Sequence, residues 1–165
     1  VGYRGNKVRG ERWYNHMPAV AIRDRLPQEV WDGYCKICNI RNPWDKTVSW
    51  FHFRNPDVKN ESEAEIIGRF RRWLADDPEK IGHDRGIYFI DGAPVADEYI
   101  RYETLSEDYS RICRKLGIVE KPIPELKTAQ RGKNGIPYQN YYDAELRDKV
   151  AALYDKEIEA FGWDF

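Results

Sequence analysis

Hydrophobic and polar positions form two kinds of pattern along this chain, one extended and one helical. Residues 34–40 combine aromatic, β-branched and sulfur-containing side chains with few breakers, which predicts a buried strand. The strand ends at Asn42, because the residue before a proline is disfavoured in helix. Pro43 suits a first helical turn, and apolar residues then recur at helical spacing as far as Phe53. The pattern predicts a strand that leads directly into a helix.

Further short strands and helices are predicted after this point. Two strand candidates, residues 87–90 and 98–103, lie on either side of the turn signal Asp91-Gly92. Three further helices are predicted from capping residues and apolar periodicity. They cover residues 62–76, 106–116 and 143–161, with Ser62, Ser106 and Asp143 as N-caps, Glu65 completing a capping box, and Gly117 and Gly162 as C-terminal stops.

Length and composition predict one soluble globular domain over residues 1–165. A chain of 165 residues can bury a sizeable core, and 41% hydrophobic residues exclude a disordered chain. The net charge of −1 means that any anion site must be local, and it argues against nucleic acid as a partner. No apolar run approaches the roughly 20 residues that a membrane span needs.

Cysteine usage points to a reducing compartment, which is the cytoplasm if the source is a bacterium or a virus. The three cysteines form an odd set without a disulfide framework. Cys35 and Cys38 have the spacing of a redox or zinc pair. Positions three apart on a strand face opposite sides, however, and no second pair follows. We interpret both as structural residues and expect no bound metal.

The strand-to-helix junction carries the first candidate site. Arg41 lies at the carboxyl end of the predicted strand, where α/β sheets bind ligands, and Ser49 lies two turns into the helix. Helix entrances favour anions, and a guanidinium together with a hydroxyl suits a phosphate. From spacing alone, a purely structural role for both residues is an equal alternative.

The segment Arg-Asn-Pro-Trp-Asp-Lys-Thr-Val-Ser resembles the 3′-phosphate-binding segment of sulfotransferases that use 3′-phosphoadenosine 5′-phosphosulfate (PAPS), in which an arginine precedes a serine by eight positions. Tyr102-Glu103 and the segment from Tyr141 to the end are also similar to the glycan and bacterial branch of that family. The resemblance implies an α/β protein with a short central parallel sheet flanked by helices, in the P-loop-nucleotide-kinase-like sulfotransferase fold without its first strand, loop and helix. It also implies that Arg41 and Ser49 bind the 3′-phosphate of PAPS or of the product 3′,5′-ADP, and that Glu103 is structural and ties loops at the strand end.

His16 is the candidate catalytic base. Imidazole titrates near neutral pH and can accept a proton from a reacting hydroxyl. The alternative is a partly buried histidine that caps the helix beginning at Pro18. The sequence His-Met-Pro-Ala, placed before the phosphate-binding strand, resembles the family segment that carries the base, and it supports the catalytic interpretation.

A second cationic stretch, residues 127–135, contains Arg131, Gly132 and Lys133. A glycine-containing basic loop can cradle a phosphate. The stretch resembles the late sulfotransferase loop that closes over the 3′-phosphate, although its spacing departs from the cytosolic form. A flexible basic linker is the alternative.

The acceptor is expected to be a hydroxyl or amine, and a carbohydrate is the first choice. Arg69, Arg71 and Arg72 form either a solvated helix face or a contact for an acidic acceptor.

The family's amino-terminal strand and Lys-x-Gly-x-Thr-like loop, which binds the 5′-phosphosulfate, have no counterpart in residues 1–12. The competing hypothesis is therefore a non-catalytic or fragmentary sulfotransferase-like module that binds anionic ligands or a partner chain. A sheet edge left open where the first strand should pair is expected to favour a homodimer.

Overall fold

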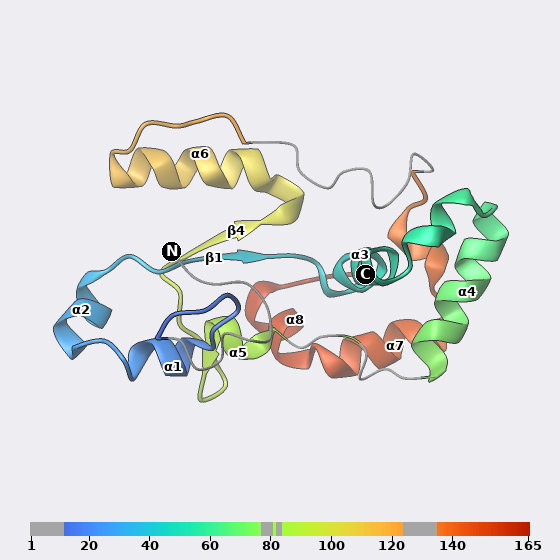
Figure 1. Cartoon of the computed structure of the whole chain (residues 1–165), viewed down its shortest axis with the longest axis horizontal. Coiled ribbons are helices and arrows are strands. Elements are labelled where there is room, and N and C mark those ends of the chain that lie inside the picture. The colour runs from blue at the N-terminus through green and yellow to red at the C-terminus, as the bar shows by residue number, and fades with distance from the viewer. Residues whose placement is uncertain (1–11, 77–80, 82–83, 124–134) are drawn as a thin grey trace. The chain divides into compact units, whose positions relative to one another are not determined.

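The computed structural model describes residues 12–76, 81, 84–123 and 135–165 and confirms an α/β protein. Strands β1 (Ile37–Ile40) and β4 (Glu98–Arg101) pair in a small parallel sheet flanked by helices (Figure 1). The chain forms two compact units, Val1–Cys38 with His83–Tyr99, and Asn39–Gly82 with Ile100–Phe165. The boundary between these units falls within β1 and within β4. That residues 1–165 act as one domain stays a prediction.

The first unit contains short elements. Helix α1 (Ala19–Arg23) packs against α5 (Arg85–Tyr88) and β2 (Phe89–Ile90), and α2 (Gln28–Gly33) precedes β1. Strand β2 pairs in antiparallel fashion with β3 (Ala93–Pro94). The predicted turn at Asp91 and Gly92 is confirmed, since both residues have positive φ (52° and 79°), as a two-residue hairpin requires.

The turn joins β2 to β3, and the strand predicted over residues 98–103 follows as β4, which ends at Arg101. The strand predicted over residues 87–90 is extended only at Phe89 and Ile90, because a helical turn from Asp84, with the Ile87 N–H bonded to the Asp84 carbonyl (2.8 Å), occupies the residues before it.

The second unit holds the larger core. Its elements are α3 (Pro43–Arg54), η2 (Pro56–Asn60), α4 (Glu63–Asp76), η4 (Tyr102–Thr104), α6 (Leu105–Leu116), η6 (Tyr138–Tyr141), α7 (Ala144–Leu153) and α8 (Asp155–Phe161). Helices α3, α4 and α7 pack with η6 around Phe70, whose ring makes edge-on contacts with Phe51, Tyr141 and Tyr142 at 5.1–5.4 Å between centroids. Each such pair contributes about 0.5–1.5 kcal/mol beyond burial.

Local capping signals of this unit are confirmed at both ends of its helices. Glu65 accepts hydrogen bonds from the Ser62 N–H and hydroxyl (2.8 and 2.6 Å), as a capping box requires. Asp143 accepts the Leu146 N–H (2.9 Å) and begins α7. Gly117 and Gly162 adopt left-handed conformations directly after α6 and α8.

Two predicted helix boundaries of this unit are wrong. Helix α6 begins at Leu105, because the Asp108 carboxylate accepts the Thr104 hydroxyl and the Arg101 N–H and so ties the strand end to the first helical turn. The helix predicted over residues 143–161 is interrupted at Tyr154, whose φ of −110° and ψ of 25° are not helical. Tyr154 is fully buried, so packing decides where this helix breaks.

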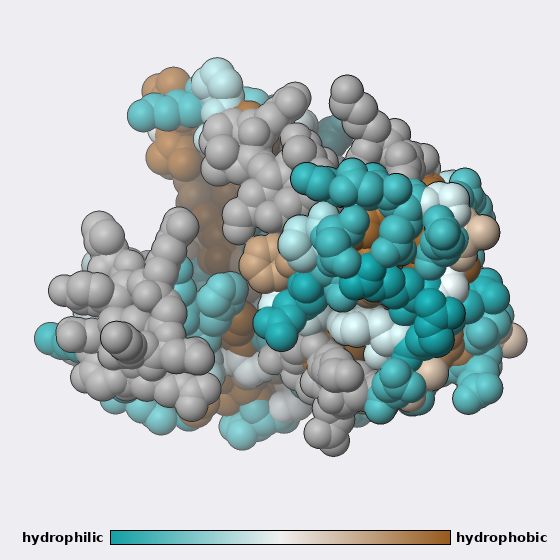
Figure 2. Space-filling model, turned by 45° about the vertical axis from the view of Figure 1, so that its right-hand side comes forward, coloured by the Kyte–Doolittle hydropathy of each residue, from teal (hydrophilic) through white to brown (hydrophobic). Residues whose placement is uncertain are grey.

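The surface of the second unit on the side that carries α4 is mainly hydrophilic, with hydrophobic residues visible only in gaps (Figure 2). Among the helices within residues 12–76, 84–123 and 135–165, none is both long enough and apolar enough to cross a bilayer. Cys35 is exposed, Cys38 half-buried and Cys113 buried, and none of the three forms a disulfide.

Candidate anion-binding site

The end of β1 and the start of α3 form a corner organised by Asn42. Its side-chain oxygen accepts the N–H groups of Trp44 (3.0 Å) and Asp45 (3.3 Å), which makes Asn42 the N-cap of α3. Its Nδ2 donates to the carbonyl oxygen of Asp164 (2.8 Å). The dipeptide Asn-Pro is a recognisable N-cap and first-turn signature, so the sequence carried this signal.

The first-turn N–H groups of α3 are already bonded, which corrects the expectation that the helix entrance offers them to an anion. Pro43 has no N–H. The Trp44 and Asp45 N–H groups bind the Asn42 side chain, and the Lys46 N–H binds the Asn42 carbonyl (2.8 Å). An anion at this corner must therefore be bound by side chains.

Arg41 is held in a fixed orientation at this corner. Its Nε donates to the Asp45 carboxylate (2.5 Å), and its guanidinium carbon lies 4.0 Å from the centre of the Tyr102 ring. The Arg41 and Asp45 side chains are only 17% and 11% exposed. The two Nη groups make no hydrogen bond to any residue of the described chain. The guanidinium is thus positioned through Nε and one face, with its Nη donors left over.

Ser49 follows Asp45 by one helical turn on α3 and is half-buried. Residues four apart share a helix face, so Ser49 and Asp45 lie on the same stripe. Arg41 reaches the start of this stripe through its bond to Asp45. Ser49 therefore shares a face of α3 with the carboxylate that holds Arg41. The spacing of four from Arg41 to Asp45 was the available sequence signal for this carboxylate.

The end of β4 supplies the other side of the corner. The Glu103 carboxylate accepts the Asn42 backbone N–H (2.7 Å), which confirms that Glu103 ties the two strand ends together. Tyr138 lies nearby, with its hydroxyl 3.5 Å from Asn42 Nδ2. Burial raises the pKa of Tyr138, and the charges of Asp45 and Glu103 raise it further. We call Arg41, Asn42, Asp45, Tyr102 and Glu103 the Arg41 corner; it holds one guanidinium and two carboxylates.

The other predicted site residues do not belong to the described corner. His16 is exposed, has a positive φ of 57°, and belongs to the first unit. Its alternative role as a helix cap is wrong, because Pro18 is the N-cap of α1 and no side chain caps that helix. Arg131, Gly132 and Lys133 lie outside the described residues.

Two of the three arginines predicted to form a solvated face or an acceptor contact, Arg69 and Arg71, have structural partners. Arg69 forms ion pairs with Asp57 (2.7 Å) and Glu61 (2.6 Å), and its hydrogen bond lowers the pKa of Asp57. Arg71 donates to the carbonyl oxygens of Tyr141 and Tyr142. Arg72 remains exposed.

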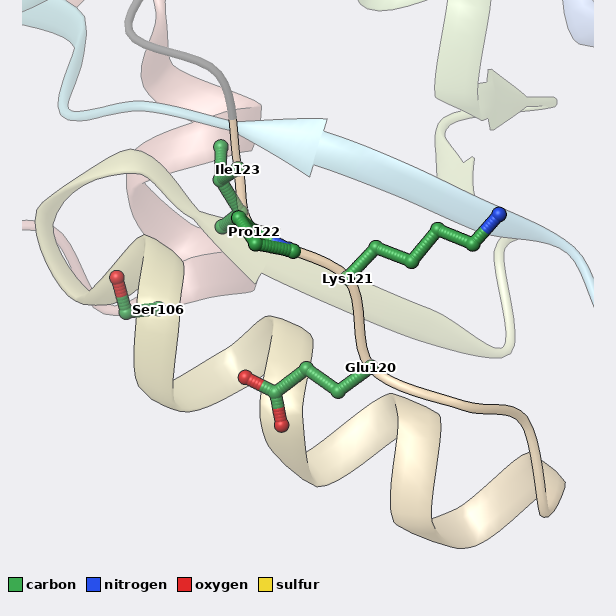
Figure 3. A pocket seen from close by; sticks show the side chains of 5 residues that line it. All are labelled: Ser106, Glu120, Lys121, Pro122 and Ile123. Carbon is green, nitrogen blue, oxygen red and sulfur yellow. The ribbon is translucent and has the colours of Figure 1, made fainter.

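An open groove of about 420 Å³ lies beside α6, lined by Ser106, Glu120, Lys121, Pro122 and Ile123 (Figure 3). Glu120 is bonded to the Ser110 hydroxyl (2.6 Å). Within the described part of the chain, no group of three or more histidine, cysteine, aspartate or glutamate side chains has a geometry that could hold a metal ion. The Arg41 corner is therefore the stronger candidate site.

Comparison with known proteins identifies a relative in Archaeoglobus fulgidus, described as an uncharacterized protein. It is 31% identical over 116 residues, which cover 68% of this chain and 92% of that protein. No family model matches the chain. No solved structure matches it either.

Proposed function

Because this chain belongs to the same family as the Archaeoglobus fulgidus protein, whose description assigns no activity, we propose a function from the site itself. The chain is a sulfotransferase module that binds PAPS and transfers its sulfuryl group to a hydroxyl or amine, with a carbohydrate as the first choice of acceptor. The proposal includes the finer fold, in which β1, Arg41 and α3 correspond to the 3′-phosphate-binding strand, turn and helix of the P-loop-nucleotide-kinase-like sulfotransferases.

The observation that carries this proposal is the orientation of Arg41. Asp45 and Tyr102 hold the guanidinium by Nε and by one face. Neither Nη group is hydrogen-bonded to a described residue, so both can donate to a ligand. A guanidinium fork matches two phosphate oxygens, and Ser49 adds a hydroxyl on the same helical stripe. A phosphate monoester such as the 3′-phosphate fits this donor set.

The charge balance of the corner explains why a second cationic segment is part of the proposal. One guanidinium beside Asp45 and Glu103 leaves the corner with a net charge of −1, which by itself repels a dianion. Arg131 and Lys133, with Gly132 between them, would add two positive charges over the 3′-phosphate. In this proposal the corner orients the phosphate, and residues 131–133 provide most of the attraction.

The transfer step has a simple balance. The acceptor oxygen forms a bond to sulfur while the bond between sulfur and the 5′-phosphate oxygen breaks, and 3′,5′-ADP leaves with that electron pair. The acceptor proton passes to a ring nitrogen of His16. The residues of the Arg41 corner bind the nucleotide and do not touch the transferred group.

Calorimetric titration with 3′,5′-ADP tests the proposed site. Arg41→Ala removes charge-assisted hydrogen bonds of about 1.5–3 kcal/mol, so we expect affinity to fall roughly ten- to a hundredfold. Arg54→Ala is the matched control, because this substitution removes the same charge from the other end of α3, where the Arg54 guanidinium lies over the Trp50 ring. Equal affinities for wild type and Arg41→Ala would sink the assignment.

Arg41→Lys separates geometry from charge at the same position. Lysine keeps the positive charge but loses the fork and the Nε bond to Asp45. If the fork matters, Arg41→Lys should recover less than half of the lost binding free energy. Full recovery would indicate a nonspecific electrostatic attraction.

A non-catalytic anion-binding module is the second candidate, and the two carboxylates at the corner favour it. Incubating the protein with PAPS and a panel of carbohydrate acceptors distinguishes the two. Transfer that is abolished by His16→Gly supports the enzyme. The binding module is supported if the protein binds 3′,5′-ADP but neither transfers the sulfuryl group to any acceptor nor hydrolyses PAPS.

Homodimerisation through a sheet edge is also a proposal. Light scattering over a range of protein concentrations tests it, and a mass equal to one chain throughout contradicts it.

A further inference from the structure

Residues 163–165 pack onto the Arg41 corner through both backbone and side chain. The Asp164 carbonyl accepts Asn42 Nδ2 (2.8 Å), across 122 positions of sequence. The Phe165 ring makes edge-on contacts with Trp44, Tyr142 and Tyr138, at 5.5, 5.6 and 5.8 Å between centroids. These partners come from α3, from η6 and from the residue that follows η6.

Strand β4 anchors the same segment from the other side. Arg101, the last residue of β4, donates from Nη2 to the Phe161 carbonyl (2.6 Å), and its guanidinium carbon lies 4.3 Å from the centre of the Trp163 ring. Trp163 is only 8% exposed. Gly162, in a left-handed conformation, redirects the chain between α8 and these contacts. The segment is therefore fixed at both of its ends.

We propose that residues 163–165 are a positioning element for the anion site, acting through Asn42. The identity of the anion rests on the proposed function, whereas the positioning itself does not. The Asn42 side-chain oxygen accepts the N–H groups of the first turn of α3, and its Nδ2 donates to the Asp164 carbonyl at 2.8 Å and to the more distant Tyr138 hydroxyl at 3.5 Å. The Asp164 carbonyl takes the donor, so the oxygen must face the first turn of α3.

The consequence for Arg41 follows from its neighbours. Arg41 precedes Asn42 directly, and Asp45, which holds the Arg41 Nε, is one of the residues that Asn42 caps. If the Asp164 contact is lost, the Asn42 amide can rotate and the first turn of α3 opens more often. The Arg41 guanidinium then loses its fixed orientation, and anion affinity falls although no residue that touches the anion has changed.

Phe165→Ala tests this inference with two measurements. Amide hydrogen exchange of Trp44 and Asp45 should become about three- to tenfold faster, and 3′,5′-ADP should bind about three- to tenfold more weakly. Phe53→Ala is the matched control, since Phe53 is similarly exposed (45% against 40% for Phe165) and lies in the last turn of α3. Phe165→Tyr keeps the ring and should leave both the exchange rates and the 3′,5′-ADP affinity close to those of wild type.

A double-mutant cycle with Asn42→Ser tests the route through Asn42. Serine still caps the helix but cannot donate to the Asp164 carbonyl as the amide does. The losses from Asn42→Ser and Phe165→Ala should be less than additive, since both break the same link.

The outcomes separate this inference from the proposed function. Unchanged Trp44 and Asp45 exchange in folded Phe165→Ala overturns the positioning role, and so do strictly additive losses. If Phe165→Ala does not fold, Phe165→Leu is measured in its place. If wild type fails to bind 3′,5′-ADP, the proposed function fails. The positioning role is then still decided by the exchange rates of Trp44 and Asp45 and by whether the changes in these rates add in the double-mutant cycle.

Discussion

The corner around Arg41 and the segment around His16 differ in how much of the protein holds each side chain. Arg41 contacts the Asp45 carboxylate and the Tyr102 ring, and its neighbour Asn42 binds Glu103 and Asp164 from 61 and 122 positions away. His16 is exposed and sits in a left-handed backbone conformation. A side chain that is already ordered loses less conformational entropy when it binds a ligand. The corner is therefore organised before binding, and the histidine is not.

The two regions also differ in backbone strain and in how fully their backbone N–H groups are hydrogen-bonded. The left-handed conformation costs a non-glycine residue about 1–2 kcal/mol, and histidine tolerates it better than branched residues. At the corner, in contrast, each of the first-turn N–H groups from Trp44 to Lys46 is bonded. Substitutions at the corner should consequently cost stability, whereas substitution of His16 should not.

Asn42→Ala should have the largest effect. It removes the acceptor for two N–H groups and the donor to Asp164, so we expect the free energy of unfolding to fall by about 1–2 kcal/mol. Urea denaturation measures this. Asn55→Ala is the control at the other end of α3, where only one side-chain bond, to the Phe51 carbonyl, is lost. If the Asn55 variant loses as much stability as the Asn42 variant, the corner is not specially organised.

Tyr142→Phe should have an intermediate effect that depends on pH. The Tyr142 hydroxyl donates to the Trp44 carbonyl (2.8 Å), and burial raises the pKa of Tyr142 well above its ordinary value. Above about pH 10 the unfolded chain loses this proton and the folded chain keeps it, so stability falls as pH rises.

Phenylalanine should cost about 1 kcal/mol at neutral pH and make the alkaline decline less steep. Denaturation at pH 7 and at several values above pH 9 measures both changes. An unchanged alkaline slope would mean that Tyr142 ionises freely in the folded protein.

His16→Gly should have the smallest effect on stability. Glycine adopts positive φ without a steric cost, and we expect a gain of about 0.5 kcal/mol by urea denaturation. His16→Ala, which keeps the steric cost, is the control and should not be stabilised. A loss from His16→Gly as large as that from Asn42→Ala would show that the histidine is held by contacts, and the comparison between the two regions would fail.

The elements that sequence predicts well are those whose signals are local. The capping box at Ser62, the N-cap at Asp143 and the left-handed glycines at 117 and 162 each depend on residues within one helical turn. The start of α6 and the break at Tyr154 depend on contacts beyond one turn or on burial. Spacing and capping preferences alone could not predict them.

For the candidate site, the sequence alone determined which side chains stand at the junction of β1 and α3. Arg-Asn-Pro places Arg41 at the start of the helix, and the spacing of four places Asp45 within its reach. Both placements depend only on local chain geometry. The Asn42 cap, which closes the helix entrance to an anion, is also local, and the Asn-Pro sequence signals it. Only the tertiary structure decided that Tyr102, Glu103 and residues 163–165 complete the corner. These contacts join segments at least 61 positions apart, and their formation depends on the packing of the whole unit rather than on local preference.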